Sequence, residues 1–137
     1  MTVPISMIAV IHQANAALLE QGQLDAVEQF FTPDYVAHIT GRDMKGGHKG
    51  IREVVSLIRS AFPELRVEVE ILVEGEIRVA WQRTFRAIQQ GAYRGFPACG
   101  KEIIWRDMVT SQFQDGKIAE EWVVTDLAER LLLARKQ

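Results

Sequence analysis

The hydrophobic pattern of this chain changes its period at Pro63, and that change limits the folds open to it. Before Pro63, apolar residues recur at intervals of three and four, which is typical of helices that bury one face. After Pro63, apolar and polar residues alternate, which is typical of strands with one buried face. Helices followed by long, hairpin-joined strands predict an α+β fold. We expect an antiparallel sheet covered by helices on one face.

The helical part divides into three segments. The first helix is predicted to have Ser6 as its N-cap and to end at Gly22, whose missing Cβ permits a helix-ending turn. The second spans residues 24–31 and stops at Thr32-Pro33, and the third spans residues 51–61. Between the last two we expect a short strand over residues 34–40 and a glycine-rich loop over residues 41–50.

The alternating part predicts four strands over residues 65–71, 79–85, 103–113 and 118–125, followed by a helical tail over residues 127–134. Asp115-Gly116 is a strong signal for a two-residue hairpin turn. Counted outward from that turn, Asp107 would lie opposite Val124, and Trp105 opposite Asp126. A one-residue bulge would shift this register.

Length and composition predict one domain that spans residues 1–137. The chain has 137 residues, of which 47% are hydrophobic, enough for a single core. Its net charge is −2 and it has no basic run, so we expect no nucleic-acid partner. Cys99 is the only cysteine, which fits a reducing, cytoplasmic compartment. The N-terminal segment has no basic n-region and is interrupted by polar residues, so we expect neither a signal peptide nor a membrane association.

Polar side chains interrupt several of the predicted apolar stripes. Arg83 interrupts a strand stripe and Asn15 interrupts the stripe of the first helix. Two carboxylates, an arginine and two tryptophans on inward faces indicate a lined cavity rather than a filled core. The predicted lining residues of this kind are Asn15, Arg83, Trp105, Asp107, Trp122 and Asp126. A simpler interpretation is a buried ion pair of Arg83 with Asp107 or Asp126 that only fixes strand register.

Histidines and common motifs give little sign of a metal or cofactor. All three histidines lie in the first 50 residues without the spacing of a metal site. The chain also has no P-loop, GxGxxG, GxSxG or HExxH motif. We therefore predict no metal and no cofactor. His38 follows a strand-like segment and is either a structural residue or a base that faces the pocket.

Four stretches resemble the SnoaL-like polyketide cyclase family, within the larger superfamily named for nuclear transport factor two. They are PDYVAH (33–38), AFPELRVEVE (61–70), GAYRGFPACGK (91–101) and DGKIAEEWVVTD (115–126). The resemblance runs over nearly the whole chain. It implies a cone-shaped α+β barrel in which three N-terminal helices pack into a strongly curved antiparallel sheet around a deep pocket.

The resemblance also implies a chemistry. Studied members close a ring by an intramolecular aldol step without metal or cofactor, and their acid–base aspartate matches Asp126 here. Two departures accompany this match. Ile88-Gln89 stands where many relatives carry Thr-His, and no histidine follows His48, although studied cyclases use one on the later strands.

The expected function is acid–base chemistry on a small apolar ligand that contains a carbonyl group, with Asp126 as the catalytic residue. Enone isomerisation and epoxide hydration on the same fold are alternatives, as is a binding protein in which Asp126 only forms a salt bridge. We also expect a homodimer, because the outer face of the last two strands would be unusually apolar. The residues expected on that face are Met108, Thr110, Val123 and Thr125.

Overall fold

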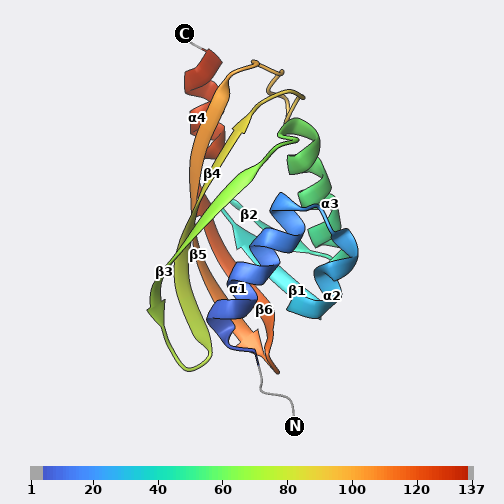
Figure 1. The fold of residues 1–137 in the computed structure, drawn as a ribbon, viewed down its shortest axis with the longest axis vertical. Helices are drawn as coiled ribbons and strands as arrows, with labels where there is room; N and C mark the ends of the chain where they lie inside the picture. Colours follow the sequence, from blue (N-terminus) through green and yellow to red (C-terminus); the bar gives the residue numbers. More distant parts are fainter. Residues whose placement is uncertain (1–4, 136–137) are drawn as a thin grey trace.

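The computed structural model describes residues 5–135 and shows helices packed against one face of a curved six-stranded sheet (Figure 1). The helical elements are α1 (Met7–Ala14), the π-helix η1 (Asn15–Glu20), the 3-10 helix η2 (Leu24–Ala26), α2 (Val27–Phe30), α3 (Gly47–Ala61) and α4 (Leu127–Arg135). The strands are β1 (Phe31–Ile39), β2 (Arg42–Lys45), β3 (Arg66–Glu74), β4 (Arg78–Ile88), β5 (Glu102–Gln114) and β6 (Lys117–Thr125). The α+β prediction is confirmed.

The sheet has the order β2-β1-β6-β5-β4-β3, and one of its strand pairs is parallel. Strands β3 to β6 follow one another through antiparallel hairpins, as the alternating half of the sequence predicts. Strand β1 pairs with β6 in the parallel direction, so the expectation of a wholly antiparallel sheet is wrong for this pair. The two strands are far apart in the chain, and no tight turn dictates their relative direction.

The β5–β6 hairpin begins as predicted and then changes register. Asp115 and Gly116 both have positive φ angles, as a two-residue turn requires, and Gln114 pairs with Lys117. Beyond Ile118, one extra residue on β6 forms a bulge that shifts the pairing. Asp107 therefore lies opposite Thr125, and the predicted pairing with Val124 is wrong.

The bulge reverses which side chains of β6 face the helices. Glu121 and Val123 are buried, whereas Trp122 is 36% exposed and Val124 is 62% exposed. The inward placement predicted for Trp122 is wrong, and Val124, which was expected opposite the inward Asp107, also faces outward. Strict alternation fails here because the strand contains an extra residue.

The N-terminal helix follows its predicted limits but changes its winding. The Ser6 hydroxyl accepts a hydrogen bond from the backbone of Ala9, and Gly22 has a φ of +67° just past the helix end. The α-helical part ends at Ala14, and a π-helix begins at Asn15, whose amide donates to the Ile11 carbonyl at 2.8 Å.

The predicted loop over residues 41–50 is shorter than expected. It contains strand β2 and the first turn of α3, which starts at Gly47. Gly47 has a φ of +55°, and a Cβ built there would lie 2.2 Å from the Pro33 carbonyl oxygen on β1. The glycines that suggested a loop therefore allow α3 to start close against β1.

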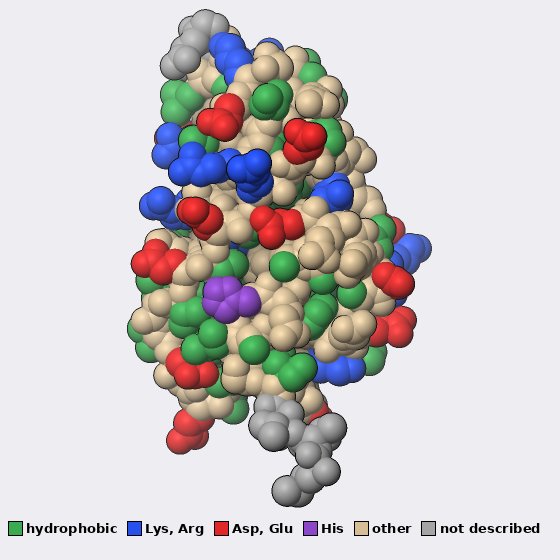
Figure 2. All heavy atoms as spheres, viewed as in Figure 1, with side chains coloured by type: hydrophobic (Ala, Val, Ile, Leu, Met, Phe, Trp, Pro, Cys, Tyr) green, Lys and Arg blue, Asp and Glu red, His purple; other side chains and the backbone are tan. Residues whose placement is uncertain are grey.

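The core lies between the helices and the concave face of the sheet. Phe85 and Trp105 stack there with ring centroids 4.7 Å apart, and Phe62 packs on Trp105 at the same distance. On the face drawn in Figure 2, acidic and basic side chains are interspersed, in keeping with the small net charge. No helix in the described part of the chain is both long and apolar enough to cross a membrane.

Candidate functional site

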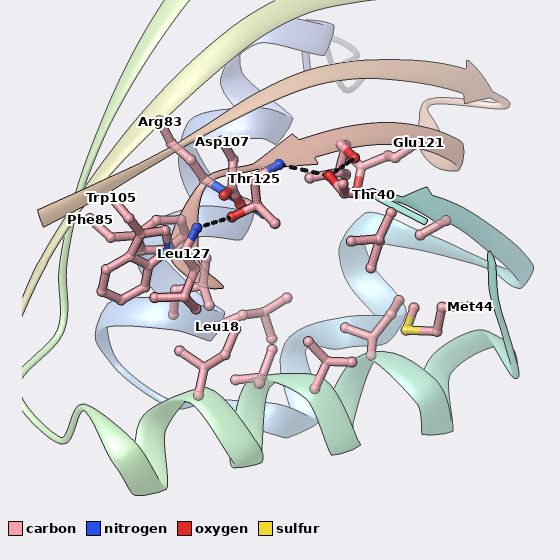
Figure 3. Close-up of a pocket in the computed structure, with 18 of the residues that line it drawn as sticks. Leu18, Thr40, Met44, Arg83, Phe85, Trp105, Asp107, Glu121, Thr125 and Leu127 are labelled. Atoms are coloured by element: carbon pink, nitrogen blue, oxygen red, sulfur yellow. Dashed lines mark hydrogen bonds and ion pairs between the residues drawn. The ribbon is translucent and has the colours of Figure 1, made fainter. Parts of the chain in front are cut away.

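A cavity of about 410 Å³ separates the helices from the inner face of the sheet. Its helix side is apolar, and Figure 3 shows Leu18 on that side with Arg83 and Asp107 across the space on the strands. Apolar residues on the helix side include Leu18, Ile51, Val54, Val55 and Ile58. An apolar cavity of this size with a few polar groups is typical of a small-molecule site.

Asp107 on β5 and Arg83 on β4 form an ion pair inside this cavity. They are direct cross-strand neighbours, and both Nε and Nη2 of Arg83 lie 3.0 Å from Oδ2 of Asp107. Nη1 of Arg83 donates to the Asn15 side-chain oxygen, also at 3.0 Å. The guanidinium further lies over the rings of Trp81 and Phe85. These contacts hold the arginine, and with it one oxygen of Asp107, in a single position.

The second oxygen of Asp107 has no such restraint. Asp107 is 6% exposed, and its Oδ1 is buried without a hydrogen-bond partner among the described residues. A buried carboxylate oxygen without a partner is costly, so it needs a reason to be there. Asp107 lines the cavity, and Oδ1 is the carboxylate oxygen that the described residues leave without a partner.

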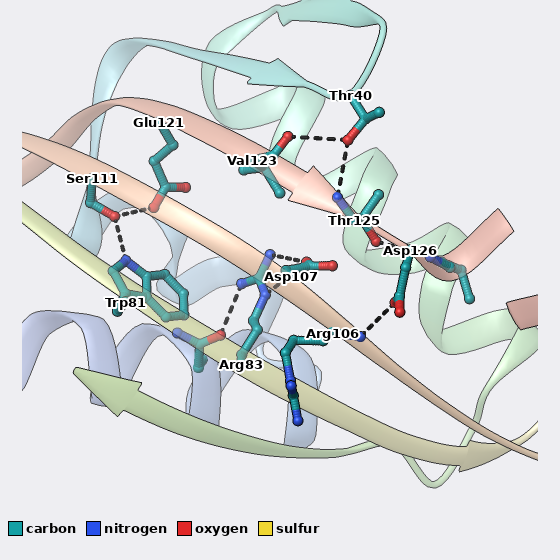
Figure 4. Close-up of polar contacts among 12 residues, drawn as sticks. Thr40, Trp81, Arg83, Arg106, Asp107, Ser111, Glu121, Val123, Thr125 and Asp126 are labelled. Carbon is teal, nitrogen blue, oxygen red and sulfur yellow. Dashed lines mark hydrogen bonds and ion pairs between the residues drawn. The ribbon is translucent and has the colours of Figure 1, made fainter. Parts of the chain in front are cut away.

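Glu121 on β6 is a second buried carboxylate, and hydroxyl groups hold it. The Tyr35 hydroxyl donates to Oε1 at 2.6 Å, and the Ser111 hydroxyl donates to Oε2. The indole N–H of Trp81 donates to the Ser111 oxygen at 2.9 Å (Figure 4). Burial raises the pKa of Glu121 above its usual value of 4.5, although both hydroxyls and Arg83 oppose this shift. Burial, followed by the nearby Glu121, also raises the pKa of Tyr35.

Four of the predicted lining residues do line the cavity, namely Asn15, Arg83, Trp105 and Asp107. Each comes from a helix or strand whose inward face could be read from local periodicity. Residues 103–113 of β5 alternate regularly, so the inward placement of Trp105 and Asp107 is independent of the register of β6.

His38 and Trp122 lie together on the outer face of the sheet, and their expected place in the pocket is wrong. Their rings stack with centroids 5.4 Å apart. The His38 ring nitrogens lie 2.8 Å from Asp43 and 2.6 Å from Glu120. Hydrogen bonding, first to Glu120 and then to Asp43, raises the pKa of His38 above 6.5. Strand β1 turns Ala37 and Ile39 to the cavity, and so it turns His38 away.

Asp126 also lies outside the cavity lining formed by the described residues, which contradicts its predicted inward placement. It follows the end of β6 and directly precedes α4. Its Oδ1 accepts the backbone N–H of Arg106 at 2.8 Å, and its Oδ2 pairs with Arg130 at 3.1 Å. In Figure 4 Asp126 and Arg106 form a contact separate from the Arg83–Asp107 pair. Its side chain is 31% exposed and joins β5 to the start of α4.

Sequence reasoning missed the buried group around Glu121. Glu120 and Glu121 are adjacent, and regular alternation assigns the inner face to Trp122 instead. Tyr35 lay in a predicted strand without any sign of its partner. The bulge in β6 is what places Glu121 next to Tyr35 and Ser111. The pattern of residue types in β6 gives no sign of this bulge.

No three histidine, cysteine or carboxylate side chains in the described part of the chain lie close enough to hold a metal ion. Asp43 and Glu120 contact different ring nitrogens of His38, so the three cannot converge on one point. The expected absence of a metal or cofactor stays a prediction.

The fold is a curved sheet that encloses an apolar cavity lined in part by the buried carboxylates Asp107 and Glu121. Residues 9–132 match the profile of the SnoaL-like polyketide cyclases, and the chain belongs to that family. No curated protein matches the chain.

Several solved structures share this fold. A candidate polyketide cyclase from Acidithiobacillus ferrooxidans superposes with a TM-score of 0.83 at 20% identity, covering 99% of each chain. AclR from Streptomyces galilaeus, a candidate hydroxylase, has a TM-score of 0.77 at 26% identity over 95% of this chain and 96% of its own. A SnoaL-like polyketide cyclase from Agrobacterium tumefaciens has a TM-score of 0.75 at 25% identity over 93% and 98%.

Proposed function

We propose that this protein is an enzyme that moves protons on an apolar carbonyl compound without a cofactor, and that Asp107 is its acid–base group. One observation carries the proposal. Arg83 holds one oxygen of Asp107, while the other oxygen is buried and has no hydrogen-bond partner among the described residues, in a side chain that lines the cavity. A fixed carboxylate with one free oxygen suits a group that must take a proton and return it. Membership of a family named for polyketide cyclases supports the same chemistry.

The proposed reaction is a ring closure of the aldol type. Oδ1 of Asp107 takes a proton from the carbon next to a ligand carbonyl, and the C–H electron pair forms an enolate. The enolate carbon attacks a second carbonyl of the same ligand, so that a C–C bond forms and the second carbonyl oxygen gains the electron pair. Asp107 then returns its proton to that oxygen. Arg83 balances the charge of the carboxylate before and after the transfer, and Asn15 holds Arg83 in place.

The family resemblance assigns the same role to Asp126, so the two aspartates form a matched pair for a test. The probe is 2-acetonaphthone, an apolar ketone whose methyl protons exchange with D₂O when a base removes them. Exchange followed by NMR measures the proposed first step directly. Asp107→Asn should slow this exchange by roughly 10²–10⁴-fold, the usual contribution of a general base.

Asp126→Asn is the control, since it makes the same chemical change outside the cavity. It should keep the exchange rate and lose at most about 1 kcal/mol of stability, as expected for a half-exposed ion pair. Exchange that survives Asp107→Asn and disappears in Asp126→Asn would refute the proposal. Wild-type protein that binds the ketone without accelerating exchange would identify a binding protein instead.

A further inference from the structure

The cavity wall also contains the hydrogen-bonded pair of Tyr35 and Glu121, which has no role in the reaction described above. We propose that Tyr35, held by Glu121, is the hydrogen-bond donor that receives the carbonyl oxygen of the ligand and stabilises the enolate. Tyr35 would touch the ligand, and Glu121 would act as a positioning residue. The inference deepens the proposed function, because the enolate stage depends on proton removal by Asp107.

Tyr35 is held rigidly at the cavity wall. It is 4% exposed, and the ring of Phe31 meets it edge-on with centroids 4.9 Å apart. Its hydroxyl contacts Glu121, and both residues line the same cavity as Asp107. Figure 3 shows Glu121 and Asp107 at separate places along the wall of this cavity. A ligand in the cavity can therefore meet Asp107 and Tyr35 with different atoms.

The burial of Glu121 favours a neutral carboxyl group. Among the described residues no lysine, arginine or histidine forms an ion pair with it. The groups that face it are Tyr35 from β1, Ser111 and Asp107 from β5, and Arg83 and Trp81 from β4. Burial and the charge of Asp107 raise the pKa of Glu121, while Ser111, Tyr35 and Arg83 lower it less than burial raises it.

A proton on Glu121 changes what Tyr35 can offer. When Glu121 is ionised, the Tyr35 hydroxyl donates to it and presents only an oxygen acceptor to the cavity. When Glu121 is protonated, its O–H can donate to the Tyr35 oxygen, and the phenolic O–H is free to turn toward a ligand carbonyl. A buried neutral carboxylic acid that serves as a hydrogen-bond donor at pH 7 is an attested device in enzymes.

The step balances without a covalent bond to the protein. Asp107 takes the proton from the ligand carbon, the electron pair of that C–H bond forms the C=C bond of the enolate, and the π electron pair of the C=O bond moves to the carbonyl oxygen. Tyr35 keeps its proton and donates a hydrogen bond to the oxygen as negative charge develops there.

Paired ligands measure this contact separately from catalysis. 2-Acetonaphthone and 2-ethylnaphthalene have similar size, but only the ketone accepts a hydrogen bond. Wild-type protein should bind the ketone about three- to tenfold more tightly, as expected for one neutral hydrogen bond. Tyr35→Phe should remove this preference and the shift of the bound C=O stretching frequency. Tyr93→Phe, which removes the other tyrosine hydroxyl of the chain, should keep both.

The pH dependence tests the role of Glu121. The ketone preference should weaken as pH rises through the raised pKa of Glu121, because the Tyr35 proton then turns to the carboxylate. Glu121→Gln offers an amide donor to Tyr35 and should keep the preference over the same pH range. A preference that survives Tyr35→Phe, or that falls with pH equally in Glu121→Gln, would overturn the inference. If Asp107→Asn slows D₂O exchange of the ketone but keeps the binding preference for the ketone, the inference stands. If Asp107→Asn leaves the exchange rate unchanged, the proposed function is refuted, while the binding preference still tests Tyr35 separately.

Discussion

At the scale of single residues, the cavity gives its two carboxylates opposite surroundings. Asp107 forms an ion pair with the Arg83 guanidinium, whereas the described side chains that hydrogen-bond to Glu121 are the hydroxyl groups of Tyr35 and Ser111. Burial raises the pKa of Glu121 and so favours the form that carries a proton, whereas Asp107 has an ion-pair partner in Arg83. Two carboxylates whose surroundings differ in this way can serve as base and as donor in one reaction.

The surroundings of Glu121 predict a pH-dependent stability. The pKa of Glu121 in the folded state is raised above its usual value of 4.5. At a pH between 4.5 and the folded-state pKa, the folded protein therefore binds more protons than the unfolded chain. The contribution of Glu121 to stability is therefore fully present below about pH 4.5 and is lost as pH rises through its folded pKa. Urea unfolding over a pH series should show wild type losing stability relative to Glu121→Gln across this window.

The control for that series is Glu53→Gln, which removes a carboxylate from the exposed side of α3. A difference between wild type and Glu121→Gln that stays constant with pH would contradict the raised pKa.

At the scale of elements, two irregularities place the polar side chains of the site. The helix changes from α to π winding at Asn15, whose side chain reaches Arg83. The bulge in β6 turns Glu121 into the cavity. Local departures of this kind are often found at functional sites. The regular elements around these irregularities form the rest of the site. Helix α3 supplies much of the apolar wall of the cavity, and the regular alternation of β5 turns Trp105 and Asp107 toward the cavity.

The close start of α3 against β1 predicts an unequal pair of glycine substitutions. Gly41 and Gly47 both have positive φ angles, so alanine at either should cost about 1–2 kcal/mol from backbone strain. At Gly41 no atom of the described residues beyond its two chain neighbours lies within 4 Å of the added Cβ, whereas at Gly47 the added Cβ meets the Pro33 carbonyl. Gly47→Ala should therefore lose about 1–3 kcal/mol more than Gly41→Ala in chemical unfolding. Equal losses would show that α3 can move away from β1.

At the scale of the whole molecule, the outer face of the sheet is apolar where β5 and β6 meet. Met108 and Val124 are paired neighbours there, exposed by 45% and 62%, with Trp122 further along β6. Val123 and Thr125, which were expected on this face, point inward to the cavity. The face is still apolar, but the bulge determines which residues form it.

We propose that two copies of the chain cover this face in a homodimer. A lysine at Val124 would have to be buried in that interface, so Val124→Lys should convert a dimer to a monomer in light scattering at micromolar concentration. Leu57→Lys, at an exposed leucine of α3, makes the same change on the helical layer and should keep the dimer. Wild-type protein with the mass of a monomer would contradict the proposal.

The sequence by itself determined the elements and several of their inner faces. The change of period at Pro63, the Ser6 cap and the Asp115-Gly116 turn are local signals, and each matches the structure. The inward placement of Arg83 and Asp107 followed from alternation within single strands, which needs no knowledge of the neighbouring strand.

Only the tertiary structure decided which carboxylates share the cavity. The inner face of β6 depends on one extra residue that the curved pairing with β5 accommodates, and a residue pattern does not show where a bulge falls. The parallel pairing of β1 with β6 brings Tyr35 to Glu121 across most of the chain. Contacts of that range depend on how the whole sheet closes, so the same shift that moved Asp126 out of the site brought Glu121 into it.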